Sequence, residues 1–157
     1  MTFSRDEIIK EVPRWLKDTQ IRSFSKQVIP AENFLSFEAQ EEIVIFKASH
    51  SEFESLAHFF FEIEKQEWNA SGVTCCLGDF EKLLAIAEVS CFESIEFRDI
   101  VSDFISKHSF GLNEALAPFN FPDGTNQCIQ LMLDWNSYVL FGIYSDQYIS
   151  LHWNTYS

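Results

Sequence analysis

The feature that most constrains the fold is a strict alternation of apolar residues in the segment 128–157, "CIQLMLDWNSYVLFGIYSDQYISLHWNTYS". Every odd position is apolar in three successive stretches: Ile129, Leu131, Leu133 and Trp135, then Val139, Phe141 and Ile143, then Ile149, Leu151 and Trp153. Side chains of a strand point alternately to its two faces. This period of two predicts a three-stranded antiparallel meander with one buried face.

The two turns of this meander decide which side chains share a face. A two-residue loop at 136–137 would pair Trp135 with Tyr138, so that odd positions would share a face with even ones. Such a slip moves a whole apolar set to the other face, at ~1.5–3 kcal/mol for each side chain. Neither turn has the Asn-Gly or Asp-Gly pair of a two-residue hairpin. We therefore predict three-residue loops or a bulge at both turns, with the odd face packed on helices and the even face open.

Helical and strand patterns precede the meander. Ser4 and Glu7 form a capping-box pattern that starts a helix, and Pro13 either ends this helix or lies in the first turn of a second one. Two short strands are expected at 33–37 and 43–48, joined by an acidic turn. The chain therefore opens with helices and then changes to strands.

The middle of the chain has mixed signals. Ser51 and Glu54 predict the start of a helix over 52–67, while 71–77 resembles a buried strand. Residues 79–89 are compatible with a helix or a strand, and the helix is preferred. A clear helical stripe runs from Phe97 to Ile105, with Ser94 as its N-cap and Gly111 as its stop, and 109–127 form an irregular connection. Together these patterns predict a single α+β domain over 1–157, in which N-terminal helices, a mixed middle section and the C-terminal meander pack together.

Charge is the main functional clue. The chain holds 11 Lys and Arg against 24 Asp and Glu, a net charge of −13. Residues 1–26 sum to +2 and residues 27–157 to −15, and no Lys or Arg follows Lys107. Direct binding to nucleic acid or to an anionic membrane is disfavoured, because both need clustered cations. A basic protein partner is favoured, although negative charge also keeps a Phe-rich chain in solution.

No sequence motif indicates catalysis. The chain lacks a phosphate loop, a dinucleotide fingerprint, a nucleophile elbow and an HExxH pair, and Cys75–Cys76 lacks the CxxC spacing of zinc or redox sites. We expect no cofactor, no metal and no enzymatic activity. The start of the chain has no apolar stretch of a signal peptide and no run is long enough to span a membrane, so we expect a cytoplasmic protein.

Two clusters are candidate contact surfaces for a partner. An aromatic side chain ringed by carboxylates suits a Lys- or Arg-rich partner, because it offers a desolvated anchor surrounded by complementary charge. The first cluster is Glu62, Glu64, Glu67 and Trp68, and the second, on the even face of the meander, is Tyr144, Tyr148 and His152. Ordinary solvated side chains are the alternative interpretation of both clusters.

In its size, its acidity and its lack of catalytic motifs, the chain resembles the bacterial immunity proteins that neutralise polymorphic toxins, including those of contact-dependent growth inhibition. This resemblance implies a tight one-to-one complex with a cognate toxin domain, often a basic nuclease, whose active or substrate-binding site is blocked. An acidic adaptor or regulatory module that binds a protein without inhibiting it is the alternative. An enzyme that uses carboxylates or His152 is a third hypothesis.

Overall fold

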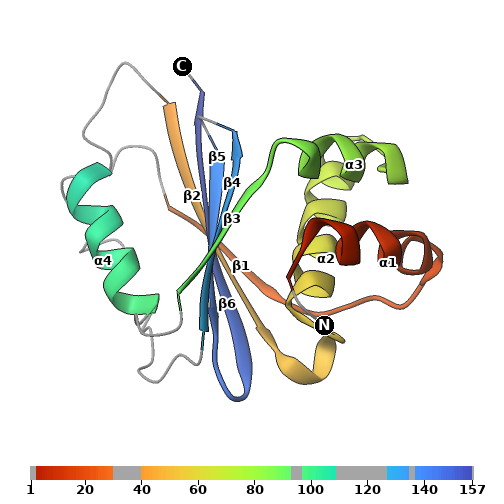
Figure 1. Ribbon diagram of the computed structural model, residues 1–157, viewed down its shortest axis with the longest axis horizontal. Helices are drawn as coiled ribbons and strands as arrows, with labels where there is room; N and C mark the ends of the chain where they lie inside the picture. The colour runs from red at the N-terminus through yellow and green to blue at the C-terminus, as the bar shows by residue number, and fades with distance from the viewer. Residues whose placement is uncertain (1–2, 30–39, 93–96, 109–126, 135–136, 157) are drawn as a thin grey trace.

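A computed structural model describes residues 3–29, 40–92, 97–108, 127–134 and 137–156. Its elements are α1 (Arg5–Lys17), β1 (Ser25–Ile29), β2 (Gln40–Ser49), the 3-10 helix η2 (His50–Glu52), α2 (Leu56–Ala70), α3 (Leu77–Ala85), β3 (Glu88–Phe92), α4 (Phe97–His108), β4 (Gln127–Asp134), β5 (Ser137–Ile143) and β6 (Gln147–Tyr156) (Figure 1). The predicted α+β class is confirmed.

The described strands form one six-stranded sheet in the order β1-β2-β6-β5-β4-β3, and all neighbours are antiparallel. The predicted meander is present as β4, β5 and β6. It is not a separate unit, because β2 extends it on one side and β3 on the other. The sequence did not indicate β1 or β3. The strand expected at 43–48 lies within β2, and the one expected at 33–37 lies outside the described residues.

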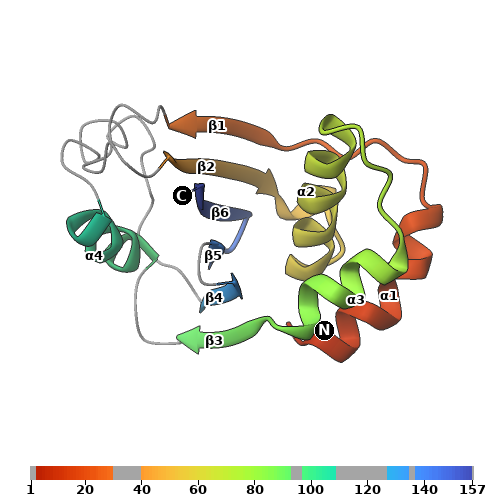
Figure 2. The ribbon, with the colours of Figure 1, turned by 90° about the horizontal axis from the view of Figure 1, so that it is seen from above.

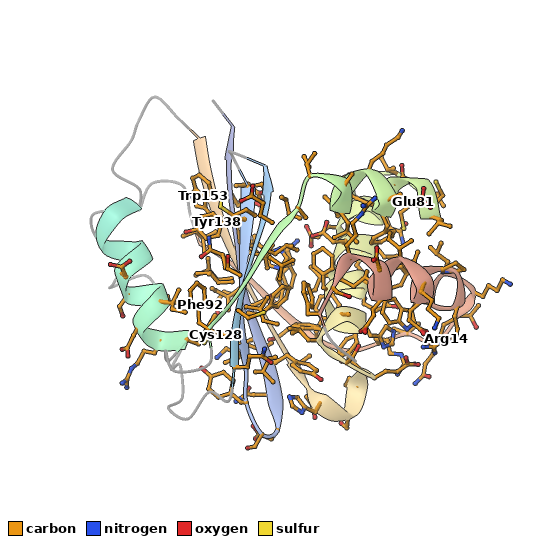
Figure 3. The ribbon with its side chains drawn as sticks, viewed as in Figure 1. Arg14, Glu81, Phe92, Cys128, Tyr138 and Trp153 are labelled. Atoms are coloured by element: carbon orange, nitrogen blue, oxygen red, sulfur yellow. The ribbon has the colours of Figure 1, made fainter. Side chains whose placement is uncertain are left out.

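Helices cover both faces of this sheet. Helices α1, α2 and α3 lie on one face, here called the three-helix face, and α4 lies on the opposite face, the α4 face (Figures 1 and 2). Figure 3 shows Phe92, Cys128, Tyr138 and Trp153 on the α4 face. Because both faces are buried, the prediction of a sheet with one buried and one open face is wrong.

The turn between β4 and β5 follows the prediction. Ile129 pairs with Phe141 and Leu131 with Val139, so odd positions share a face. The register shifts between Met132 and Asp134, which is the bulge predicted as one of two ways to keep this pairing.

The turn between β5 and β6 does not follow the prediction. Phe141 pairs with Ser150, and the backbone N–H of Tyr144 donates to the carbonyl of Gln147 at 3.0 Å across a two-residue turn. Odd residues of β5 therefore share a face with even residues of β6. The prediction assumed that a slip exposes an apolar set to water. Strand β6 is buried on both faces, so after the slip its apolar residues are still covered by helices, on the opposite face of the sheet.

This register places the even residues of the last two strands inside the protein. Tyr148 and His152 belong to the three-helix face and are 7% and 8% exposed. Tyr144 belongs to the α4 face and is 3% exposed. The ring of Tyr148 stacks on those of Phe59 and His50, at centroid distances of 5.7 and 4.0 Å. These residues do not form the open face that was expected.

Helix α2 is the centre of the three-helix layer. Its residues from Leu56 to Ile63 are all buried, which is the pattern of a helix covered all round rather than on one side. It packs against the sheet through Phe60, whose ring lies 6.1 Å from Phe141, and against α1 and α3 through Phe61, whose ring lies near Trp15 and Phe80.

Helix α1 begins as predicted, since the Ser4 hydroxyl accepts from the backbone N–H of Glu7 at 3.4 Å. It is one helix, so the expected break at Pro13 is wrong. Pro13 is on the exposed side, while Val12 and Trp15 around it are fully buried. Packing of these two side chains keeps the helix continuous, although proline has no backbone N–H to donate to the preceding turn.

Three boundaries of the middle section also differ from expectation. Helix α2 is capped by Ser55, which accepts from His58 N–H at 3.2 Å, rather than by Ser51. Residues 71–76 form no strand: the chain turns at Gly72, at φ 80°, and then runs exposed except for the buried Cys75. The ambiguous segment 79–89 is helical up to Ala85, as preferred, and then enters β3.

Helix α4 confirms the first part of the predicted stripe, since Phe97 and Val101 are buried and Ile100 packs against them. The later side chains of the stripe, the expected cap and stop and most of the irregular connection lie outside the described residues. No helix in the described part of the chain is both long and apolar enough to cross a membrane.

Candidate functional site

A pocket of about 390 Å³ opens at one end of the three-helix face. The C-terminal half of α2 and the end of α3 form its walls, and β2 and β6 form its floor with contributions from β4 and β5. This is the upper end of the sheet in Figure 1, near the end of β6. The pocket exists because the buried residues of α2 end at Ile63, and the helix then continues over the sheet with mostly polar side chains.

Helix α2 contributes one continuous stripe to this pocket. Glu64, Glu67, Trp68 and Ser71 all line it. Their spacing of i, i+3, i+4 and i+7 places them on one face of the helix. Two carboxylates and one indole ring are therefore held side by side by a single rigid element.

The two carboxylates differ in their surroundings. No hydrogen bond or ion pair holds the Glu64 carboxylate within the described part of the chain, and burial, assisted by the nearby charge of Glu67, raises the pKa of Glu64 to about 7. Glu67 forms an ion pair with Lys26 of β1, with Oε1 of Glu67 2.7 Å from Nζ of Lys26, and both side chains are about 40% exposed. Glu42 of β2 adds a third carboxylate.

His152 forms part of the floor as a neutral side chain. Its Nε2 lies 3.1 Å from the hydroxyl oxygen of Ser150, and its ring packs edge-on against Phe46 at 4.8 Å. Burial lowers the pKa of His152 to about 3, so the imidazole is uncharged at neutral pH. Its second nitrogen, Nδ1, has no hydrogen-bond partner among the described residues.

Trp68 forms the wall between this pocket and a second hollow of about 430 Å³. Its ring is half-buried and rests on Phe80 at 5.0 Å, which fixes its orientation. Two apolar side chains beside these hollows are open to solvent, Val73 at 52% and Ile86 at 62% exposure. The surface around Trp68 therefore combines an aromatic anchor, exposed apolar groups and carboxylates.

The structure brings together four of the seven residues proposed from the sequence as contact residues. Glu64, Glu67, Trp68 and His152 line this one pocket. Glu62 does not: it is 3% exposed, and its Oε1 lies 3.8 Å from His58 Nε2 and 3.9 Å from Lys65 Nζ. Its expected outward orientation is wrong, because α1 covers the side of α2 that was predicted to face solvent.

Tyr144 and Tyr148 are likewise buried in the two cores described above. Sequence reasoning missed the other lining residues, among them Glu42, Ser71, Leu83 and Ile86. The i+7 spacing from Glu64 could have indicated Ser71. Glu42, Leu83 and Ile86 reach the pocket only through tertiary packing, so no local pattern marks them.

The arrangement suits a cation better than other ligands. Three carboxylates, a neutral imidazole and an aromatic ring surround the space, and these groups accept hydrogen bonds or attract positive charge. Among the described residues, no three His, Cys, Asp or Glu side chains are grouped so as to hold a metal ion. An organic cation with several hydrogen-bond donors is the ligand that these groups best complement.

Comparisons of the chain with protein-family models, with curated proteins and with solved structures gave no match.

Proposed function

We propose that this protein is an acidic immunity-type inhibitor, which binds a basic bacterial toxin domain of the nuclease class in the cytoplasm and blocks its active or substrate-binding site. The single observation that carries this proposal is the surface around Trp68. There Glu42, Glu64 and Glu67 surround an indole ring, and the exposed side chain of Ile86 lies beside it.

The physical argument is complementarity. A nuclease binds phosphates through clustered Lys and Arg, so its substrate-binding surface is basic. A protein with a net charge of −13 is attracted to such a surface and associates rapidly with it. A rigid aromatic side chain at the centre of the contact supplies the desolvated anchor that dominates the energy of many interfaces. Trp68 is held in that role by its contact with Phe80.

The test needs the cognate toxin domain, and the candidate is the C-terminal domain of a large secreted protein encoded directly upstream of this chain. We expect the two purified proteins to form a one-to-one complex in which the nuclease activity of the toxin domain is lost. The association rate should fall steeply as salt rises. Failure to bind, or binding with full nuclease activity, would remove the inhibitor function.

Variants sharpen this test. Trp68→Ala should weaken the complex at least 30-fold, which corresponds to about 2 kcal/mol at an interface hot spot. Glu81→Gln is the matched control for Glu64→Gln, since Glu81 is an exposed carboxylate on α3 away from the pocket (Figure 3). We expect Glu64→Gln to weaken the complex and Glu81→Gln to change its affinity less than twofold.

The second candidate is an adaptor that uses the same surface without inhibiting its partner. It is favoured by the exposed Val73 and Ile86, which would serve any protein contact. Binding to a basic partner whose activity is unchanged would identify this function.

An enzymatic function is the third candidate, and Glu64 favours it, because a carboxyl with a pKa of about 7 in a pocket is suited to proton transfer. Turnover of a substrate that is lost in Glu64→Gln would support this function.

A further inference from the structure

The pocket leaves acceptor groups unsatisfied. The Glu64 carboxylate and the Nδ1 atom of His152 have no partner in the described part of the chain, although His152 is 8% exposed. A volume of about 390 Å³ lies within the range of ligand pockets. Both residues line the pocket, so a ligand that donates hydrogen bonds can pair with acceptor atoms that no described residue occupies.

The charge of the pocket selects a cation. Glu42, Glu64 and Glu67 line it, and the ion pair from Lys26 engages Glu67 alone among these three carboxylates of the described chain. An incoming cation next to Glu64 would stabilise the ionised carboxylate that burial disfavours.

The shape of the donor required distinguishes arginine from lysine. A guanidinium is planar, stacks on an indole ring and carries five N–H donors in a fixed fork. It can therefore lie on Trp68 while donating to carboxylates at positions 64 and 67. An ammonium is compact and strongly hydrated, and it gains less from an aromatic wall.

We infer that the pocket receives a single arginine side chain of the protein partner, whose guanidinium stacks on Trp68 between Glu64 and Glu67, and that Lys26 holds Glu67 until this guanidinium displaces it. The inference rests on the proposed function, and it names the part of the partner that enters the site. The Lys26–Glu67 pair is suited to exchange, because both side chains are about 40% exposed and an exposed ion pair is weak.

The first experiment uses small probes in place of the partner. ¹⁵N-labelled protein is titrated with N-acetyl-arginine amide and, separately, with N-acetyl-lysine amide, while the indole N–H signals are followed by NMR. We expect the arginine probe to shift the Trp68 signal and to bind at least fivefold more tightly than the lysine probe. Equal affinities, or a Trp68 signal that does not move, would overturn the inference.

Variants then test the named groups. Glu64→Gln keeps the shape of the side chain and should weaken the arginine probe at least tenfold, whereas Glu81→Gln should leave its affinity within twofold. If Glu64→Gln were unfolded, the NMR spectrum would show it. Trp68→Phe, which keeps a ring on Phe80, then provides the second variant. It should weaken binding of the arginine probe severalfold, as measured from the backbone signals of α2. Unchanged affinity in a folded Glu64→Gln protein would contradict the inference.

The role of Lys26 has its own matched pair. Lys26→Met should strengthen binding of the arginine probe about threefold, since the internal competitor is removed. Lys10→Met changes the net charge equally from an exposed position on α1 and should have no such effect. Equal strengthening by both variants would indicate a general charge effect and would exclude the exchange.

The pH dependence gives a further readout. The groups around Glu64 are Glu67 on its own helix, Lys26 on β1, Glu42 on β2 and His152 on β6. Because arginine favours ionised Glu64, the affinity should rise between pH 6 and pH 8 in the natural protein and stay flat in Glu64→Gln. A flat profile in both proteins would contradict the role of Glu64.

These outcomes separate the inference from the proposed function. If the arginine probe binds as expected but the toxin domain is not bound, the immunity function fails and the pocket remains an arginine site. If the toxin domain is inhibited but the probe does not bind at Trp68, the function stands and the arginine inference fails.

Discussion

The two faces of the sheet are both buried, but they are built differently. The three-helix face is packed with large rings from three helices, as in the contacts of Phe60 with Phe141 and of Phe61 with Phe80. The described residues of the α4 face form a smaller, mainly aliphatic cluster, into which α4 inserts Phe97 and Val101. On that face the fit depends on a close approach, because Phe97 lies directly over Gly142.

This difference explains where a ligand site arises. Large rings on a helix as long as α2 fill the space over the centre of the sheet but not over its end. The space that remains there is the pocket, and its lining is ionisable because the last turns of α2 are polar. The α4 face leaves less room for such a pocket, since a single helix packs directly against it. We therefore expect mutations on the three-helix face to separate stability from binding.

The largest effect is expected in the ring core. Phe60 is fully buried between Phe3 and Phe141, with ring centroids 6.0 and 6.1 Å away. Phe60→Ala should lower the free energy of unfolding by ~3–5 kcal/mol, because it leaves a cavity that the surrounding rings cannot fill. Urea unfolding measures this change, and Ile86→Ala, at an exposed position, should stay within about 0.5 kcal/mol.

The α4 face is tested by adding volume rather than removing it. A Cβ atom on Gly142 would lie 2.6 Å from Cγ of Phe97, which is a clash. Gly142→Ala should therefore cost ~1–3 kcal/mol of stability. The double variant with Phe97→Ala should lose less stability than the sum of the losses in the two single variants, and a double-mutant cycle measures this difference. Strictly additive losses would show that Phe97 does not press on Gly142.

Local patterns predicted the elements that a single covering layer determines. The α+β class, the stripe of α4, the Ser4 cap and the bulge between β4 and β5 follow from periodicity and capping within short windows. The register of β6 and the burial of Glu62 could not be predicted in this way. Both depend on a second layer, α4 or α1, whose position the local sequence does not encode.

The candidate site shows the same division. Glu64, Glu67 and Trp68 were found because they are neighbours on one helix, and His152 was found for an incorrect reason, as a member of an open face. Glu42 and Ile86 reach the pocket from other elements and carry no local signal of it. A site made by the end of one helix over a sheet is therefore only half visible in the sequence.

A smaller effect is expected from His152, and its sign follows from its pKa. The folded-state pKa of about 3 lies below the usual 6.5, so the unfolded chain binds a proton first. The stability that neutral His152 contributes is complete above pH 6.5 and is lost as the pH falls towards 3. Between pH 7 and pH 5 the loss should be about 2 kcal/mol. Urea unfolding at both pH values should show this loss in the natural protein and its absence in His152→Gln.

The smallest effect, with the opposite sign, is expected from Glu64. Its folded-state pKa of about 7 lies above the usual 4.5, so the folded protein favours the protonated carboxyl. The associated stability is complete below pH 4.5 and is lost as the pH rises through 7. Glu64→Gln should therefore stabilise the protein at pH 8 by about 1 kcal/mol, after allowance for solvent screening, and have little effect at pH 4.

Thermal unfolding at these two pH values measures the difference, and a gain that is equal at both would exclude titration of Glu64 as its cause. A substitution that raises stability while it weakens binding of the arginine probe is characteristic of a functional position, because a group kept for a ligand is not optimised for the fold. Phe60→Ala on the same face is expected to lower stability. Opposite outcomes at positions 60 and 64 of one helix would show where the core ends and the site begins.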